Sequence, residues 1–271
     1  MTSEWATPPP SAPAMPTDGR LDGQVAVVTG AAGRLGRVWI DALASAGATP
    51  VGVDILEAGG DSDEAHEVAD VTDRDSLATA ASRIEDEVGA VSILVNNAGI
   101  DQPPHSASRT YAIEEVPLDD FRRTLDVNLL GTFNATQAFG AGMRDRGYGS
   151  IVNIGSLYAS RAPDPRLYDH LDVDPPFLKP AAYGASKAGV VSLTTYFARL
   201  WGPQGVRVNA LSPGGVAGGQ DQEFVRKYTE RVPLGRMAEP EDLIGPLLFL
   251  ATDASRYVTG QNLRVDGGIT V

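Results

Sequence analysis

Short runs of apolar, β-branched residues alternate with longer segments in which apolar residues recur at helical spacing, from Leu21 to the end of the chain. This alternation is the signature of successive strand–helix–strand units, whose strands lie parallel in one sheet. The expected strands are Val25–Thr29, Thr49–Asp54, Glu67–Ala69, Val91–Val95, Ile151–Ile154, Val206–Leu211 and Leu263–Val265. The expected helices are Leu35–Ala46, Asp73–Val88, Leu118–Arg146, Ala181–Trp201 and Glu239–Ala251.

These elements predict an α/β fold, a doubly wound parallel seven-stranded sheet of the Rossmann type. In such a sheet, ligands bind at the carboxyl ends of the strands, where the strand order reverses. A chain of 271 residues lies at the upper edge of what one core supports, which favours a single domain over residues 21–271. Residues 1–20 are rich in Pro and Ala and are expected to form a flexible tail, although Trp5 leaves open docking on a neighbouring subunit.

The composition narrows the choice of partners and compartment. A net charge of −13, with no basic cluster, repels phosphate backbones and anionic lipid, so we expect neither nucleic acid nor membrane as a partner. No apolar run approaches the length that crosses a bilayer. The absence of Cys excludes disulfides and thiolate chemistry and fits a reducing compartment, with cytoplasmic location as the default.

A turn of small residues follows the first strand and opens a helix. It contains Gly30, Gly33 and Gly36, with Arg34 and Leu35 between the last two glycines. Glycines at such a position let backbone N–H groups and the positive end of the helix approach a pyrophosphate. Similar turns also occur for purely steric reasons, so the loop alone does not establish a cofactor site.

A carboxylate in the second strand supports a dinucleotide. Asp54 ends that strand, 18 residues beyond Gly36, close to where a carboxylate accepts hydrogen bonds from the adenosine ribose. The same carboxylate repels a 2′-phosphate, so NAD is expected and NADP is the less favoured alternative. Arg34 and Arg37 lie beside the loop and could reach a 2′-phosphate, the pyrophosphate or a subunit neighbour.

Tyr183 and Lys187 stand four residues apart at the start of an expected helix, which places both side chains on one face. A cation so close favours the phenolate, so we expect the pKa of Tyr183 to fall toward the working pH, as a general base for an alcohol proton requires. Pairs at this spacing are common on protein surfaces, and only their context makes this one a catalytic candidate.

Taken together, these motifs resemble the short-chain dehydrogenase/reductase family, in its single-domain Tyr-x-x-x-Lys branch. The resemblance extends from about Leu21 to the end of the chain, with the motifs in family order. Its matching residues are Thr29–Gly36, Asp70-Val71, Asn96–Gly99, Asn128 within Asp126-Val127-Asn128, Ser156, Tyr183, Lys187 and Ser212-Pro213-Gly214.

The resemblance implies a role for each matching residue. Asp70 and Val71 would contact the adenine, and Asn97, Ala98 and Gly99 would close the cofactor cleft. Pro213 and Gly214 would pass beneath the nicotinamide, with Val216 beginning the substrate loop. The implied catalytic residues are Asn128, Ser156, Tyr183 and Lys187. Ordinary structural roles remain open at Asp70, at the Asn97–Gly99 turn and at Asn128, where the alternatives are a loop carboxylate, a strand cap and a core hydrogen bond.

In the mechanism that the resemblance implies, Ser156 and Tyr183 hold the substrate oxygen and Tyr183 takes its proton as hydride moves to the nicotinamide. Lys187 stabilises the phenolate and contacts the nicotinamide ribose, and Asn128 relays the proton through water. The protein is thus expected to be an enzyme, an NAD-dependent oxidoreductase acting on CH–OH groups.

Two features depart from the family pattern. Arg34 replaces a glycine that the family turn usually carries, and we expect its backbone N–H still to face a phosphate. Ser156 and Tyr183 are 27 positions apart, about twice the usual separation, which predicts a loop insertion over residues 157–182 beside the substrate pocket. Its polar side chains favour a polyol, sugar or other small polar substrate, and padding of a subunit interface is the alternative. These side chains are Tyr158, Arg161, Arg166, Tyr168, His170 and Lys179.

The remaining expectations concern metals, assembly and competing functions. His66, His105 and His170 share no metal-ligand spacing and are expected at the surface, so no metal site is predicted. The C-terminal segment around Asp266-Gly267-Gly268 resembles one through which family members assemble, so a homo-oligomer, a tetramer or dimer, is expected. Two other functions stay open: NADPH-dependent reduction of 3-oxoacyl or other carbonyl groups, and NAD binding by a sensor or scaffold without catalysis.

Overall fold

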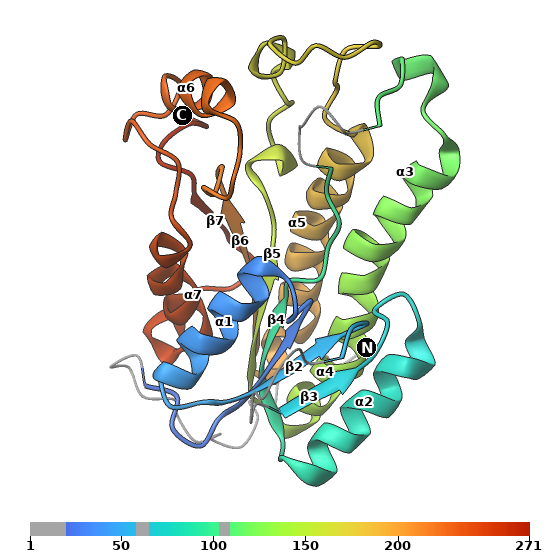
Figure 1. Ribbon diagram of the computed structural model, residues 1–271. Coiled ribbons are helices and arrows are strands. Elements are labelled where there is room, and N and C mark those ends of the chain that lie inside the picture. The colour runs from blue at the N-terminus through green and yellow to red at the C-terminus, as the bar shows by residue number, and fades with distance from the viewer. Residues whose placement is uncertain (1–19, 58–64, 103–108) are drawn as a thin grey trace, which may run out of the picture.

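The computed structural model describes residues 20–57, 65–102 and 109–271 (Figure 1). The expected tail, with Trp5, and His105 lie outside the described residues. The described chain forms one sheet with helices on both of its faces, as the alternating pattern predicts.

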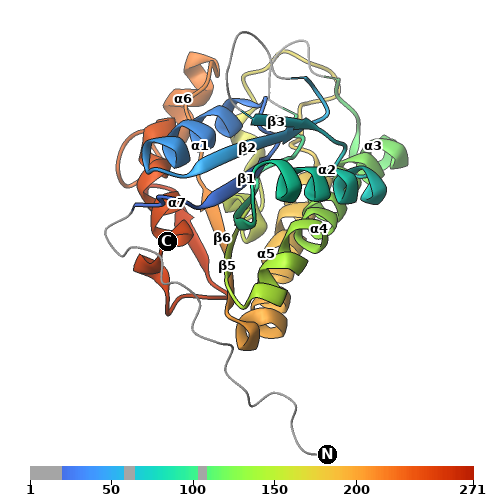
Figure 2. The ribbon, with the colours of Figure 1, turned by 90° about the horizontal axis from the view of Figure 1, so that it is seen from below.

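All seven strands pair in parallel, in the order β3-β2-β1-β4-β5-β6-β7 (Figure 2). β1 lies between β2 and β4, so the strand order reverses there and a crevice opens at the carboxyl ends of the strands. The doubly wound Rossmann-type sheet is confirmed. The strands are β1 (Val25–Thr29), β2 (Thr49–Asp54), β3 (Ala65–Val68), β4 (Val91–Asn96), β5 (Gly149–Ile154), β6 (Val206–Pro213) and β7 (Asn262–Val265).

Two helical layers cover the sheet because its central strands are apolar on both faces. Every residue of β1, β4 and β5 is buried. Helices α1 (Arg34–Ser45) and α7 (Ile244–Ala251) pack on one face around Trp39, and α2 (Arg74–Glu87), α4 (Gly131–Arg146) and α5 (Ala181–Trp201) pack on the other around Phe139 (Figure 2). Removal of apolar area from water at both faces stabilises the sheet.

The helix boundaries differ from the expected ones in three places. The single helix expected over Leu118–Arg146 is α3 (Leu118–Leu125), a π-helical segment at Asp126–Leu130 and then α4. The helix expected from Glu239 begins as a 3₁₀ turn at Pro240–Leu243, with α7 following. Helix α6 (Gln222–Thr229) was not expected, because its short amphipathic pattern resembles that of a loop.

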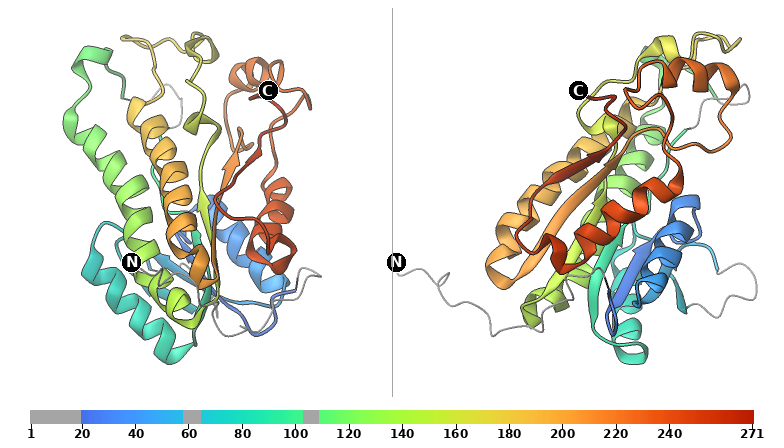
Figure 3. Two further views of the ribbon diagram at one scale, coloured as in Figure 1. Left: turned by 180° about the vertical axis from the view of Figure 1, so that it is seen from behind. Right: turned by 90° about the vertical axis from the view of Figure 1, so that its left-hand side faces the viewer.

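The insertion packs against α6 and the C-terminal segment of its own chain, at the carboxyl-end side of the sheet (Figure 3). Tyr168 of the insertion stacks on Phe224 of α6, with ring centroids 5.6 Å apart, and Phe177 lies 5.0 Å from Tyr168. Leu157, Leu167 and Ile269 complete this third hydrophobic cluster. The insertion therefore has a small core of its own, which holds α6 over the end of the sheet.

We predict that Phe177→Ala lowers the free energy of unfolding by about 3–5 kcal/mol, because it removes a buried ring from this small core. Leu118→Ala is the control, since its apolar side chain at the start of α3 is 68% exposed. Urea unfolding followed by circular dichroism measures both. Equal, small losses would contradict a packed insertion.

Candidate active site

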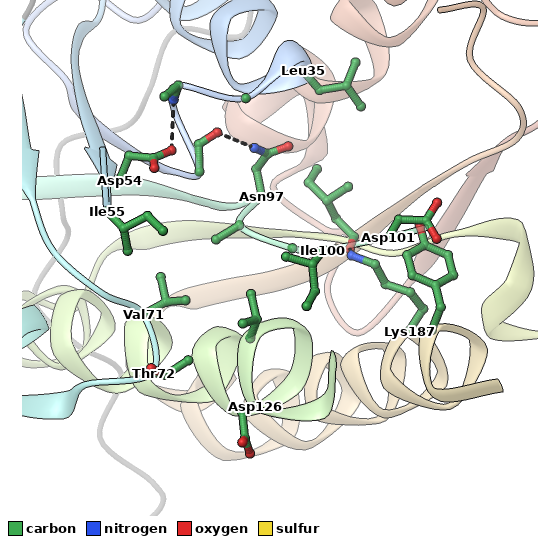
Figure 4. Close-up of a pocket in the computed structure, with 18 of the residues that line it drawn as sticks. Leu35, Asp54, Ile55, Val71, Thr72, Asn97, Ile100, Asp101, Asp126 and Lys187 are labelled. Atoms are coloured by element: carbon green, nitrogen blue, oxygen red, sulfur yellow. Dashed lines mark hydrogen bonds between the residues drawn. The ribbon is translucent and has the colours of Figure 1, made fainter. Parts of the chain in front are cut away.

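One elongated cavity of about 1240 Å³ runs along the carboxyl ends of β1, β2, β4 and β5. Figure 4 shows Asp54 and Val71 toward one end and Lys187 toward the other, with Asn97 and Ile100 between them. The cavity brings together almost all the residues that the sequence singles out. It is lined by Gly30, Gly33, Arg34, Leu35, Asp54, Asp70, Val71, Asn97, Ala98, Gly99, Ser156, Tyr183, Lys187, Pro213, Gly214 and Val216.

The loop after β1 is built for close backbone approach. Gly30 has a φ of +66°, and a Cβ on it would lie 2.7 Å from the Cα of Ala98. A Cβ on Gly36 would lie 2.2 Å from the carbonyl oxygen of Gly30, so Gly36 packs the helix onto the loop. No side chain caps the start of α1 at Gly33. The N–H groups of its first turn are therefore available for an anion, beside the positive end of the helix.

The Arg34 side chain crosses the cavity mouth. Its guanidinium donates a hydrogen bond to the carbonyl oxygen of Ala217, in the loop after β6. A Cβ on Gly218 would meet the same guanidinium, so the Arg34 side chain lies directly against this loop. Arg34 stands where the family usually has glycine, and its side chain links the phosphate loop to the start of the substrate loop. Its backbone still begins α1.

Asp54 is held in place at the end of β2. One carboxylate oxygen accepts from the Ala32 N–H at 3.0 Å (Figure 4). The other accepts from the Leu56 N–H at 3.1 Å. These bonds orient the carboxylate at the rim of the cavity and link it to the phosphate loop. Each oxygen keeps a lone pair for a further donor such as a ribose hydroxyl.

Asp70 lies at the same end of the cavity, where it accepts hydrogen bonds from the N–H and hydroxyl of Thr72, each at 2.8 Å. The carbonyl of the adjacent Val71 accepts from the Asn134 amide at 3.0 Å, which fixes this turn to α4. The Val71 side chain lines the cavity, so an apolar surface faces whatever occupies this end.

Asn97 joins β4 to the phosphate loop. Its amide donates to the carbonyl oxygen of Gly30 at 3.0 Å (Figure 4). The same amide donates to the carbonyl oxygen of Thr29 at 3.1 Å, and the Asn97 oxygen accepts from the Trp39 indole at 2.8 Å. The sequence did not single out Trp39 for this position. Its helical spacing indicated only a buried apolar residue, and its indole N–H proves to need an acceptor at the cavity wall.

Asn128 lies in the π-helical segment and is fully buried. Its oxygen accepts from the Ile100 N–H at 2.7 Å, and its amide donates to the Ile100 carbonyl at 3.0 Å and to the Ser186 hydroxyl at 3.1 Å. The extra residue of a π-segment turns a side chain off the regular helical face, which aims Asn128 at the loop after β4. Asn128 thus positions that loop against the turn of α5 between Tyr183 and Lys187.

Ser156, Tyr183 and Lys187 meet at the other end of the cavity. Ser156 follows β5 and accepts from the Tyr158 N–H at 3.1 Å. Lys187 donates to the Ile154 carbonyl at 2.7 Å, and its Nζ lies 5.9 Å from the centroid of the Tyr183 ring. A hydroxyl donor, a phenol and a buried cation therefore surround one small volume, an arrangement suited to holding an oxygen and moving its proton.

The pKa values of this pair differ from the expected ones. Burial raises the pKa of Tyr183, Asp101 and Tyr158 raise it further, and only a hydrogen bond with Ser156 opposes the rise. Burial also lowers the pKa of Lys187 to about 8. The expected fall in the pKa of Tyr183 is wrong for this structure, because desolvation of the buried phenolate raises the pKa. Tyr183 is held as the neutral phenol.

The chain after β6 closes the cavity floor. Gly214 donates from its N–H to the Val265 carbonyl at 2.9 Å, and a Cβ on it would lie 2.8 Å from the Cα of Asp266. Val216 pairs with Ala238 in an isolated bridge. Glycine at 214 thus permits the close passage of two backbones below the cavity.

The insertion supplies fewer polar groups than expected. Tyr168 is buried against Phe224, Arg166 pairs with Asp164, and His170 is half-buried between Asp221 and Lys227, so His170 is not the surface residue that we expected. Of the six polar residues that the sequence singled out in the insertion, only Lys179 lines either of the two cavities beside Tyr183. It lines the second cavity, of about 360 Å³, which adjoins the first.

Asp101 is the site residue that sequence reasoning missed. It follows the Asn97–Gly99 turn, lines both cavities and forms an ion pair with Lys179, with 2.5 Å between carboxylate and ammonium. A single Asp in a loop carries no spacing signal, and its partner lies 78 residues away in the chain. Only the folded chain brings the two together.

The described part of the chain contains neither a cluster of metal-ligating side chains nor a helix suited to cross a membrane. No group of three or more His, Cys, Asp or Glu residues there is placed to hold a metal ion. No helix within residues 20–57, 65–102 and 109–271 combines the length and apolar character that crossing a bilayer requires.

The cavity residues fit a nicotinamide dinucleotide. The uncapped start of α1 and the glycines around it suit a pyrophosphate, and Asp54 suits a ribose. Lys187, Ser156 and Tyr183 lie where a nicotinamide and a substrate would meet. The volume of about 1240 Å³ exceeds that of an ordinary small-ligand pocket, as a dinucleotide with its substrate requires.

We predict that Lys187→Met stabilises the ligand-free protein at pH 7, by up to roughly 3 kcal/mol, because it removes a buried ammonium whose pKa has fallen from 10.5 to about 8. Between pH 8 and 10.5 the unfolded chain holds this proton more firmly than the folded chain does, so wild-type stability rises with pH relative to the variant. Thermal unfolding at pH 7 and pH 10 measures the gap, which should shrink at the higher pH. A gap independent of pH would contradict the lowered pKa.

Comparisons with known proteins agree with this geometry. The family model described as Enoyl-(Acyl carrier protein) reductase matches residues 30–270. The chain is 37% identical to D-threitol dehydrogenase of Mycolicibacterium smegmatis, over 94% of this chain and 95% of the relative. It is 38% identical to galactitol 2-dehydrogenase (L-tagatose-forming) of Cereibacter sphaeroides, over 93% of this chain and 97% of the relative.

Solved structures superpose over the same length. A short-chain dehydrogenase from Leptospira borgpetersenii with bound NAD⁺ has a TM-score of 0.82 at 33% identity, covering 94% of this chain and 95% of that one. A gluconate 5-dehydrogenase from Burkholderia cenocepacia, in complex with NADP and tartrate, has a TM-score of 0.81 at 33% identity, covering 93% and 97%. The chain therefore belongs to the short-chain dehydrogenase/reductase family and is an NAD(P)-dependent oxidoreductase that acts on CH–OH groups.

Proposed function

We propose that this protein oxidises a secondary hydroxyl group of a small polyol or sugar, with NAD as hydride acceptor and Tyr183 as the acid/base group. The observation that carries the proposal is the gathering of Ser156, Tyr183 and Lys187 at one end of a cavity whose other end presents Asp54. Metal-free hydride transfer needs only a held substrate oxygen, a proton acceptor and a cofactor cleft, and these residues provide all three.

The residues proposed to hold the cofactor extend along the whole cavity. They are Gly30, Gly33, Arg34, Leu35 and Gly36 at the pyrophosphate; Asp54, Asp70 and Val71 at the adenosine; and Asn97, Ala98, Gly99, Tyr183, Lys187, Pro213, Gly214 and Val216 at the nicotinamide half. When bound, the nicotinamide accepts or supplies the hydride.

At the reacting end, Ser156 and Tyr183 hold the substrate oxygen between their hydroxyl groups. During oxidation Tyr183 accepts the hydroxyl proton of the substrate, and during reduction it returns a proton to the carbonyl oxygen. Because burial raises the pKa of Tyr183, the neutral phenol is ready to donate, and the oxidation direction needs help in removing its proton. The Lys187 ammonium supplies that help electrostatically as negative charge develops on the phenol oxygen.

Asn128 acts as a positioning residue in this proposal. Its bonds to Ile100 and Ser186 hold the loop after β4 against α5. A Cβ added to Gly99 would lie 3.6 Å from the Lys187 ammonium and 3.3 Å from the Asn128 oxygen. The three residues Asn128, Gly99 and Lys187 thus share one closely packed corner, from which a proton can pass toward solvent through water.

The preference for NAD rests on Asp54. A carboxylate at the rim, fixed by two backbone N–H groups, accepts ribose hydroxyls and repels a 2′-phosphate. Arg34, the nearest candidate for binding a 2′-phosphate, is already engaged with the Ala217 carbonyl. The charge balance at this end of the cavity therefore favours NAD over NADP.

The substrate class rests on polarity and on relatives. Ser156, Asp101 and Tyr183 present oxygen and charge at the reacting end, unlike an apolar pocket. The two relatives named above act, by their names, on threitol and galactitol, which are polyols. NADPH-dependent carbonyl reduction is the second candidate, because a neutral Tyr183 is the form that donates a proton to a carbonyl.

We also propose a homo-oligomer assembled through α7 and the C-terminal segment. Phe249 and Tyr257 expose large apolar surfaces there, and Val271 does so at the chain end. An interface over this segment would remove these apolar side chains from water. Light scattering of the purified protein measures the subunit number.

We predict that Tyr183→Phe lowers kcat by about 10²–10⁴-fold, because it removes the proton acceptor while keeping the ring. NADH affinity, measured by fluorescence titration, should change less than about threefold. Turnover is measured by absorbance of the reduced nicotinamide, with xylitol, galactitol and butane-2,3-diol as substrates. A variant that retains more than a few per cent of wild-type activity would show that another group moves the proton.

For the cofactor, we predict that Asp54→Ala lowers the preference for NAD over NADP by about 10-fold or more. The change should come mainly from tighter NADP binding, because the substitution removes the charge that repels the 2′-phosphate. Titration with NADH and NADPH gives both affinities. Asp70→Ala is a matched loss of a carboxylate at the same end of the cavity and should lower the affinity for both cofactors alike. An unchanged ratio in Asp54→Ala would refute the role given to Asp54.

A further inference from the structure

Asp101 and Lys179 form an ion pair beside the face of the Tyr183 ring, in which the ammonium is buried and the carboxylate is partly exposed. The Lys179 side chain is only 7% exposed, its Nζ lies 2.5 Å from an Asp101 oxygen, and it stands 5.2 Å from the centroid of the ring. Lys179 ends the insertion that distinguishes this chain, and Asp101 follows the turn after β4. The pair thus places two charges of opposite sign next to the proposed acid/base residue.

The pair keeps unused hydrogen-bonding capacity of both kinds. Lys179 has three N–H donors and spends two, on the Asp101 carboxylate and on the Gln102 carbonyl at 3.2 Å. The Asp101 carboxylate has about four acceptor positions and spends two, on Lys179 and on the Gln102 N–H at 2.8 Å. Among contacts within the described residues, one donor and two acceptors therefore remain for a further group.

The pair also stands where the two cavities meet. Ile100, Asp101, Arg123 and Tyr183 line both of them, and Lys179 lines the smaller one. For a substrate whose reacting oxygen lies between Ser156 and Tyr183, this junction is the space beside Tyr183 that the neighbouring carbon atoms can occupy. A group on the next carbon then faces the part of the wall that Asp101 forms, next to Lys179.

We propose that the Asp101–Lys179 pair binds a second hydroxyl group of the substrate, on the carbon beside the reacting one, and so selects a vicinal diol over a simple secondary alcohol. The proposal rests on the proposed function, because it assumes that the reacting oxygen lies at Tyr183. A hydroxyl both donates and accepts, so it matches the free acceptor of Asp101 and the free donor of Lys179 together. A carboxylate or phosphate lacks a donor for Asp101 and is repelled by it.

A purely structural role for the pair is the alternative, since it ties the insertion to the loop after β4. The two roles differ in what a substitution does. Loss of a structural tie lowers the melting temperature and weakens turnover of every substrate. Loss of a hydroxyl-binding pair lowers kcat/KM for a diol more than that for a monoalcohol, because only the diol uses the pair. The effect of the Asp101 charge on the pKa of Tyr183 acts on both alcohols alike and cancels in the ratio of their kcat/KM values.

The test compares butane-2,3-diol with butan-2-ol, which differ by one hydroxyl group. The main variant is the double substitution Asp101→Asn/Lys179→Met. It removes both charges together, so that neither charge is left without its partner. The matched control is Glu85→Gln/Arg146→Met, which breaks an ion pair of 3.0 Å between α2 and α4, far from the cavity. Melting temperature and NADH affinity are measured for all three proteins, and Asp101→Asn alone serves if the double variant does not fold.

We expect wild type and control to favour the diol and the double variant to lose about 10–100-fold of that preference, the range of a hydrogen bond to a charged group. The loss should come from kcat/KM for the diol, with NADH affinity unchanged. An unchanged preference, or equal losses for both alcohols, overturns the assignment while leaving Tyr183 and the proposed function in place. A wild-type protein that oxidises neither alcohol nor any polyol with NAD or NADP overturns the proposed function instead, and the hydroxyl assignment with it.

Discussion

Burial of the central strands on both faces is the constraint on which the rest of the structure depends. β1, β4 and β5 carry no exposed residue, so they require a helical layer on each side and therefore parallel crossovers. Parallel crossovers bring every carboxyl end to one edge of the sheet. The phosphate loop, Asp54, Asn97 and Ser156 share a cavity because each immediately follows, or ends, such a strand.

Backbone-directed hydrogen bonds then fix the distances along that edge. Asn97 binds the phosphate loop, Asn128 binds the loop after β4, and Asp54 binds the backbone on either side of itself. Each of these polar side chains satisfies main-chain groups that no strand or helix pairs. The cavity is therefore held open by its own walls and does not depend on a ligand for its shape, which is how a site gains preorganisation.

The insertion affects the site although it lies outside the sheet and the loops that follow its strands. Its aromatic residues pack with α6 into a separate small core, which explains why most of its polar residues point away from the cavity. Lys179 is the exception, because the insertion returns there to α5 directly beside Tyr183. An insertion can thus alter substrate choice through one residue at its end while its remaining length serves packing.

The sequence by itself determined the order of the elements along the chain, the sheet type and half of the residues that line the cavity, Asp54, Tyr183 and Lys187 among them. It could do so because strand and helix periods, glycine positions and the Tyr183/Lys187 spacing are local properties that the chain carries wherever it folds. Within residues 20–57, 65–102 and 109–271, the observed elements differ from the predicted ones at the π-helical segment, at α6 and at the start of α7. The sequence patterns in these places are short or ambiguous.

Only the tertiary structure decided the pKa of Tyr183 and the pairing of charges around it. The expected fall in the pKa of Tyr183 followed from spacing along one helix, but burial depends on all the elements that surround the phenol, and it raises the pKa. The Asp101–Lys179 pair, the Arg34 contact with Ala217 and the half-buried His170 are likewise contacts between segments far apart in the chain. Such contacts leave no periodic signal, because desolvation and charge pairing are set by distance in space and not by separation in sequence.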